Sequence, residues 1–238
     1  MTNPIEPPRR FYKAVSIELG EGGFHIRLDG RGARTPEGKV LAAPTRALAA
    51  MLAAEWEAQD QRILVASMPA NRLAFTALDR IADAREAMCA QIARYAESDV
   101  LCYFAEAPKS LEERQIQAWG PVLDWAQEAL GLRLVRTVGL KHAAQPAESL
   151  ARAEQLAREL EDFALAGLAH ATALFGSAVL AFAVQRDKLG GSTALDLSRL
   201  DEIFQAERWG VDEEAASRVQ GMLDEAVMLE SWFRALTL

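Results

Sequence analysis

The sequence contains little of what metal, redox or disulfide chemistry requires. Among 238 residues there are only two cysteines and three histidines. Two cysteines are too few for a disulfide scaffold, so buried free thiols are the expected state of Cys89 and Cys102. None of the histidines has a second His or Cys at metal-ligand spacing, so we expect no metal site. The three histidines are His25, His142 and His170.

Catalytic signatures are missing as well. There is no Gly-Lys-Ser or Gly-Lys-Thr, and strand-like residues follow the first glycine cluster, so the Gly-rich segments 20–23 and 30–32 are interpreted as hairpin turns rather than phosphate loops. Neither a Gly-x-Ser-x-Gly elbow nor a His-Glu-x-x-His pair occurs. The sequence therefore predicts no cofactor and no catalytic residue, and we expect the chain not to be an enzyme.

Positive charge is also scarce. The chain has 26 Lys and Arg against 34 Asp and Glu, which gives a formal net charge of −8. Such a surface repels phosphate backbones, which makes nucleic acids and anionic membranes poor partners. The N-terminal residues show neither an apolar signal core nor an amphipathic presequence. The expected location is the cytoplasm.

One long stretch, Phe163 to Val184, has no charged residue at all. As a helix it reaches about 30 Å, which is long enough for either a membrane span or a buried central helix. Its many small residues and the lack of Trp or Tyr at its ends favour the buried helix. We expect a bend at Gly176 and Ser177, and no membrane insertion.

The first 66 residues predict a small antiparallel sheet covered by a helix. Apolar residues alternate between Phe11 and Leu19 and again from Phe24 to Leu28, and Asp29-Gly30 is a hairpin signal. From Thr45, an expected N-cap, the apolar period becomes helical.

Residues 67–238 predict a larger helical bundle. A capping box at Ser110 to Glu113 should open one helix, and Pro121 should kink or restart it. Leu132 to Gly139 fits a short strand or a loop. A further helix from Thr193 to Arg208 should end at Trp209-Gly210. The predicted fold class is α+β, with domains 1–66 and 67–238.

Tryptophans and a late acidic group are the candidate functional positions. Trp56, Trp119 and Trp209 occupy helical positions, where core anchoring is the default role, and Gly210 suits a helix C-cap. Asp212, Glu213 and Glu214 open the last helix. From the residues alone they are either ordinary helix N-terminal charges or an acidic docking site.

Ordered motifs along nearly the whole chain resemble those of one family. They begin with Arg10-Phe11-Tyr12-Lys13, Leu28-Asp29-Gly30-Arg31 and Glu55-Trp56. They continue through Leu101-Cys102-Tyr103 and Gln115 with Trp119, and they close with Leu200-Asp201-Glu202 and Trp209-Gly210. The pattern is similar to that of the ATP synthase assembly chaperones that bind the alpha subunit of the catalytic head, the ATPase assembly factor two family. Gly120 departs from it, since an Asp is usual there.

The resemblance implies a chaperone that holds the free alpha subunit and shields its subunit interface until assembly. It places the family's important acidic residue on Glu213, with Asp212 as a neighbour that shares the role, and it makes Trp56 a fold-supporting residue. It also implies a bacterial, cytoplasmic relative of a mitochondrial matrix chaperone, and we expect a monomer when it is free. The alternatives are a generic holdase for apolar segments and, less favoured, a carboxylate-based enzyme.

Overall fold

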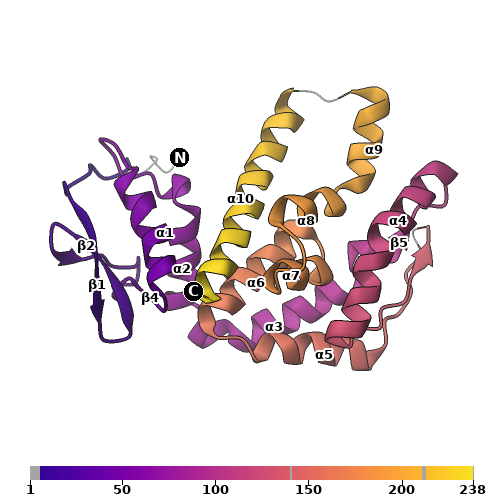
Figure 1. Ribbon diagram of the computed structural model, residues 1–238, viewed down its shortest axis with the longest axis horizontal. Coiled ribbons are helices and arrows are strands. Elements are labelled where there is room, and N and C mark those ends of the chain that lie inside the picture. The colour runs from indigo at the N-terminus through magenta and orange to yellow at the C-terminus, as the bar shows by residue number, and fades with distance from the viewer. Residues whose placement is uncertain (1–5, 140, 211–212, 238) are drawn as a thin grey trace, which may run out of the picture. The chain divides into compact units, whose positions relative to one another are not determined.

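The computed structural model describes residues 6–139, 141–210 and 213–237. A small antiparallel sheet with a covering helix precedes a larger helical region, which confirms the predicted α+β class (Figure 1). Two compact units divide the chain: Met1–Asp83 with Ser231–Leu238, and Ala84–Glu230. The predicted boundary at 66/67 falls inside the first unit, because the helix that follows it packs on the helix that covers the sheet.

The sheet of the first unit is built around one central strand. β1 (Val15–Gly20) and β2 (Gly23–Leu28) form a hairpin, and the short strands β3 (Arg31–Gly32) and β4 (Ala42–Ala43) both pair with β2. The β2–β3 turn is Asp29-Gly30, with φ of 49° and 78°, the positive values that a two-residue hairpin turn needs. The predicted hairpin is confirmed.

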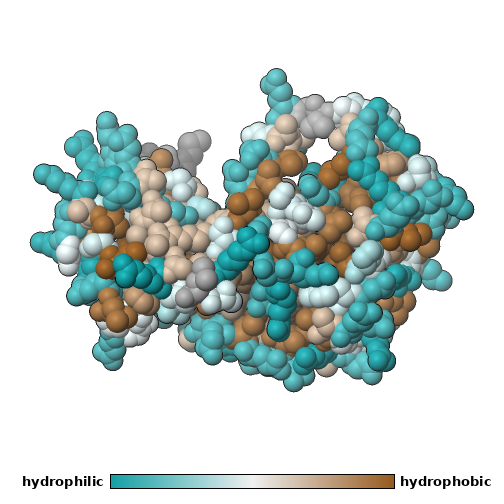
Figure 2. All heavy atoms as spheres, viewed as in Figure 1, coloured by the Kyte–Doolittle hydropathy of each residue, from teal (hydrophilic) through white to brown (hydrophobic). Residues whose placement is uncertain are grey.

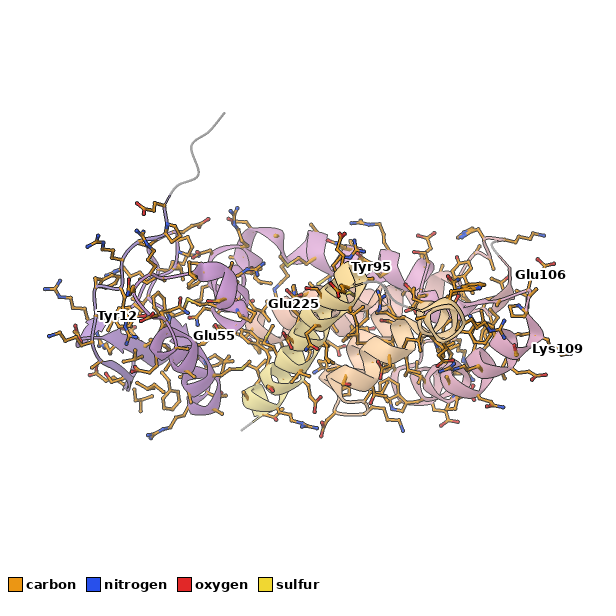
Figure 3. The ribbon with its side chains drawn as sticks, turned by 90° about the horizontal axis from the view of Figure 1, so that it is seen from above. Tyr12, Glu55, Tyr95, Glu106, Lys109 and Glu225 are labelled. Atoms are coloured by element: carbon orange, nitrogen blue, oxygen red, sulfur yellow. The ribbon has the colours of Figure 1, made fainter. Side chains whose placement is uncertain are left out.

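The helix α1 (Arg46–Glu57) covers this sheet, and Thr45 caps it as predicted by accepting a hydrogen bond from the Leu48 amide at 3.1 Å. After the short helix η1 (Val65–Ser67), α2 (Pro69–Asp79) begins without a side-chain cap from its own N-cap residue. Glu55 of α1 supplies that cap, since its carboxylate accepts the amide hydrogens of Ala70 and Asn71 at 2.8 and 2.9 Å. Glu55 and Tyr12 both lie in this unit (Figure 3).

The second unit begins within α3 (Ile81–Glu97). Its next helix, α4 (Lys109–Trp125), starts one residue before Ser110, with Pro108 at the N-cap, so the predicted capping box is wrong. The helix continues through Pro121 and ends in the π-helical turn η3 (Ala126–Leu130). The remaining elements of this region are η2 (Val100–Cys102), the parallel strand pair β5 (Tyr103–Phe104) and β6 (Thr137–Val138), and α5 (Ala147–Arg158).

The charge-free stretch forms two buried helices, α6 (Asp162–Phe175) and α7 (Ala178–Gln185), rather than one bent helix. Gly176 takes a left-handed φ of 62°, and the Ser177 side chain accepts a hydrogen bond from Leu180 to start α7. Asp99, which is fully buried, accepts a second amide hydrogen at the start of α7, from Val179 at 3.0 Å. Within the described residues, no helix is long and apolar enough to cross a membrane.

Three helices complete the second unit: α8 (Gly191–Ser198), α9 (Leu200–Trp209) and α10 (Glu213–Thr237), whose last residues belong to the first unit. The single helix predicted from Thr193 to Arg208 is thus divided between α8 and α9. At Gly191, α8 approaches α10 so closely that a Cβ atom would lie 2.0 Å from the carbonyl oxygen of Ala226. Only glycine fits at this contact.

Candidate functional site

α9 and the start of α10 stand opposite each other (Figure 1). A groove lined by residues of α8, α9 and α10 lies between them. Gly210 ends α9 with a φ of 84°, which confirms the predicted C-cap. The groove has a volume of about 650 Å³ and hydrophobic residues gather along it (Figure 2). Its apolar lining comes from α8, α9 and α10 and consists of Leu195, Ile203, Ala206, Trp209, Ala215, Ala216, Val219 and Leu223.

Trp209 stands at the end of this groove with 77% of its surface exposed. The expectation that it anchors the core is therefore wrong, because the chain leaves α9 at this residue and no element covers the ring within the described structure. By contrast, Trp56 and Trp119 are buried, and each indole nitrogen donates a hydrogen bond, to Asn71 Oδ1 and to the Leu197 carbonyl oxygen respectively.

The helix α10, across the groove from α9, begins with two exposed carboxylates, Glu213 and Glu214. Glu214 pairs with Arg218 at 3.6 Å, one turn along the same helix. Glu213 is exposed and forms no salt bridge with any described residue. Asp212, the other predicted docking residue, lies outside the described residues.

The opposite wall carries a mixed polar border. One guanidinium nitrogen of Arg199, Nη1, lies 3.8 Å from the Glu202 carboxylate oxygen Oε1. The same nitrogen lies 3.8 Å from the sulfur of Met222 on α10. Asp196 and Gln205 also line the groove. A mostly apolar lining with a few charged residues and one large exposed aromatic ring is typical of protein-binding surfaces.

Among the described residues, the other titratable groups of this unit do not form a metal site. Within the described ranges, no three His, Cys, Asp or Glu side chains are placed to hold a metal ion. His170 lies 3.2 Å from Glu225, and both cysteines are free and buried. Burial raises the pKa of both thiols, which keeps them protonated and weakly nucleophilic at neutral pH.

Comparison with known proteins identifies the family. The model of the ATP12 chaperone protein family matches residues 9–127, half of the chain. The chain belongs to the ATP12 chaperone family. This is the ATP synthase assembly chaperone family that the sequence motifs resemble, so the resemblance is confirmed.

The relatives of this ATP12 family chain come from bacteria and from yeast. The crystal structure of Atp12 from Paracoccus denitrificans superposes with a TM-score of 0.90 at 37% identity, covering 96% of this chain and 98% of that one. A putative chaperone from Agrobacterium tumefaciens, Atu1473, gives a TM-score of 0.89 at 42% identity, covering 96% and 86%. The mitochondrial protein atp12 of Schizosaccharomyces pombe is 25% identical, covering 90% of this chain and 78% of its own length.

Sequence reasoning found the acidic start of α10 in this ATP12 family chain but missed the groove beside it. A signal was present in the spacing of Ala216, Val219 and Leu223, which places three apolar residues on one face of α10. The same pattern is typical of a core-facing helix. Only the packing of α9 and α10 shows that this face remains uncovered.

Proposed function

We propose that the chain is a molecular chaperone for assembly of the ATP synthase catalytic head, which binds the free alpha subunit and shields its subunit interface. The observation that carries this proposal is the apolar groove that ends at exposed Trp209. Glu213, which has no salt bridge to a described residue, begins the helix α10 that lines one side of this groove. Membership in the ATP synthase assembly chaperone family supports the role, and the groove offers a surface on which a client can lie.

The groove has the physical properties that such a client requires. A subunit awaiting its partner exposes a large apolar interface and aggregates unless it is covered. The groove presents apolar atoms and an aromatic ring that is rigid, large and accessible. At many interfaces, a few rings of this kind that are buried in pockets of the partner contribute most of the binding energy.

Charge supplies the specificity in this proposal. Glu213 meets a basic group of the alpha subunit, and Asp212 shares the contact. A carboxylate without a salt-bridge partner among the described residues is available for such a pair, and truncating one partner of a desolvated pair costs about 2–5 kcal/mol. Glu214, which pairs with Arg218, is committed within its own helix.

Release requires no nucleotide or other cofactor in this scheme. The beta subunit competes for the same client surface, and the chaperone leaves by simple dissociation, so a moderate affinity suffices. We propose that the free chaperone is a monomer that works in the cytoplasm, in keeping with the bacterial origin of its solved relatives. We propose no catalytic activity for this chain.

Two other functions remain distinguishable by experiment. A generic holdase would bind many unfolded proteins equally well through the same apolar groove. A carboxylate enzyme would need two acid groups facing a substrate in one pocket with matched proton affinities. The apolar groove would serve a holdase as well as the proposed function, so preference for one client is what separates these two functions.

The test is capture of the purified alpha subunit by the purified chain, measured as a dissociation constant. Glu213→Lys should weaken binding by roughly 30-fold or more, which corresponds to 2 kcal/mol or more. Its thermal unfolding should change little, because an exposed charge at a helix N-terminus contributes at most about 1 kcal/mol.

Glu214→Lys is the matched control, since it reverses a neighbouring charge that already has a partner in its own helix. Equal loss in both variants would indicate a general electrostatic effect rather than a contact of Glu213. Unchanged capture by Glu213→Lys would leave Glu213 as an ordinary helix-end charge. Equal affinity for unrelated unfolded proteins would favour the holdase.

A further inference from the structure

The first unit has a groove of its own, with a volume of about 430 Å³, which is within the range of sites that bind ligands. It is formed by the segment before β1, by β2 and β3 with the loop that follows them, and by α1, α2 and the segment that joins these helices. Most of its lining is apolar. Two arginines, Arg31 and Arg34, also line it, whereas no Asp or Glu among the described residues does.

The apolar side chains of this groove are accessible. Phe11 is 71% exposed, Val65 is 43% exposed, and Phe75 is half-buried. The Phe11 ring packs edge to face on Tyr12, with the ring centroids 5.3 Å apart. Tyr12 is buried, and its hydroxyl donates a hydrogen bond to the Trp56 carbonyl oxygen at 2.7 Å, which anchors this segment to α1. Phe11 therefore offers a supported aromatic surface on which an apolar side chain can pack.

The two arginines are held at defined places along one wall of the groove. Arg31 begins β3, where it pairs with Leu28 of β2. Arg34 pairs with Val40, and its Nη1 donates a hydrogen bond to the Gly38 carbonyl oxygen at 2.7 Å. Three residues of extended chain place the Cα atoms of the two arginines roughly 10 Å apart. Both side chains are exposed, and neither forms a salt bridge with a described residue.

The carboxylates near these arginines in the chain are already bound. Asp29 accepts amide hydrogens from the two residues that precede β1, at 2.8 and 3.1 Å. Glu37 lies 3.7 Å from Arg80, and Asp79 of α2 accepts the hydroxyl hydrogen of Thr35 at 2.7 Å. Since the arginines lack a counterion among the described residues, their guanidinium donors are available to the carboxylates of a partner.

The charge of this unit also differs from that of the rest of the chain. Residues 1–83 and 231–238 contain 12 Lys and Arg against 10 Asp and Glu, whereas residues 84–230 contain 14 Lys and Arg against 24 Asp and Glu. An acidic partner is repelled by the second unit and not by the first. The groove between two uncompensated arginines thus lies in the part of the chain that an acidic segment can approach.

We propose that this groove binds a segment of a partner polypeptide in which acidic residues stand on both sides of large apolar ones. The apolar side chains pack on Phe11 and Val65. The carboxylates meet Arg31 and Arg34, whose planar guanidinium groups each match the two oxygens of a carboxylate. A polypeptide fits better than a fatty acid, because two cations roughly 10 Å apart can each meet a carboxylate only on a ligand that carries two. The groove shares no residue with the one formed by α8, α9 and α10, so this inference goes beyond the proposed function.

The test uses the peptide acetyl-Glu-Phe-Leu-Glu-amide as the probe, with acetyl-Gln-Phe-Leu-Gln-amide as its uncharged control. Both are titrated into the full isotope-labelled chain while the backbone amide signals of Phe11, Gly32 and Val65 are followed by NMR. The acidic peptide should shift these signals in a saturable way, and the control peptide should bind at least tenfold more weakly. The proposal would be overturned by the absence of a saturable shift, by equal binding of the two peptides, or by shifts confined to the Ala216 and Val219 amides of the other groove.

Arg31→Gln removes one cation and keeps the fold, because β3 pairs with β2 through the backbone. The acidic peptide should bind this variant at least tenfold more weakly. Arg46→Gln is the matched control, since Arg46 is an exposed arginine of the same unit that does not line the groove, and this variant should bind the peptide as the wild type does. Unchanged binding by Arg31→Gln, equal loss in both variants, or at least tenfold tighter binding of laurate than of the acidic peptide would refute a site for an acidic polypeptide segment.

Discussion

Asn71 offers the sharpest test of how the first unit is held together. Its side chain is fully buried between α1 and α2. The amide nitrogen donates to the Leu52 carbonyl oxygen at 3.0 Å and to Glu55 Oε2 at 2.8 Å, and the amide oxygen accepts from the Trp56 indole nitrogen at 2.8 Å. One side chain thus satisfies two buried polar groups and one half-buried carboxylate.

Asn71→Leu keeps the branching at Cγ, in a somewhat larger side chain, and removes all three hydrogen bonds. The Trp56 indole N–H is left buried without an acceptor, which costs about 1–3 kcal/mol, and the lost bond to the Glu55 carboxylate costs about 1.5–3 kcal/mol. The Asn71 backbone amide still reaches Glu55, so α2 keeps its cap. We expect the free energy of unfolding to fall by about 3–5 kcal/mol.

A double-mutant cycle with Trp56→Phe isolates the indole contact. The Phe ring lacks the N–H, so in this background Asn71→Leu no longer strands a donor and should cost about 1–2 kcal/mol less. Urea unfolding followed by far-UV circular dichroism measures all four proteins without relying on indole fluorescence. Hydrogen exchange of the Ala70 amide, which bonds to Glu55, reports whether α2 remains capped.

Additive effects, within about 0.3–0.5 kcal/mol, would refute the assigned role of the indole hydrogen bond. A loss of Ala70 protection in Asn71→Leu would show that the whole junction had collapsed, and the cycle would then not report a single contact. An unchanged slope of free energy against urea concentration serves as the control for an intact native state.

The remaining predictions concern the second unit. Gly191→Ala should lower the free energy of unfolding by more than about 2 kcal/mol, because its Cβ would lie 2.0 Å from the Ala226 carbonyl oxygen. Gly221→Ala, whose Cβ would have no atom of the described structure within 4 Å beyond its own helix backbone, should instead stabilise α10 by about 0.5–1 kcal/mol. Urea unfolding measures both variants, and a small loss of stability in Gly191→Ala would contradict the close approach. Burial raises the pKa of Asp99 from 3.8 to about 6, so between these values the folded chain binds more protons than the unfolded chain and stability falls as pH rises from about 4 to about 6. The stability of Asp99→Asn should not fall over this pH range. If the free energy of unfolding changes with pH in the same way for the variant and the wild type, Asp99 is not the cause of the fall.

The sequence by itself determined the features that depend on near neighbours in the chain. The Asp29-Gly30 turn, the Thr45 cap and the Gly210 stop follow from backbone preferences and local hydrogen bonds of those residues, and the structure has all three. The change of apolar period near Thr45 predicted the sheet and the helical region for the same reason. The family was recognisable because its motifs are also linear patterns.

Tertiary structure alone decided the features that join distant segments. The cap of α2 comes from Glu55, fifteen residues earlier than Ala70, so it could not be read from the residues around α2. Trp209 has the helical spacing of a core residue, yet its ring is exposed because no element of the described structure covers it at that end of α9.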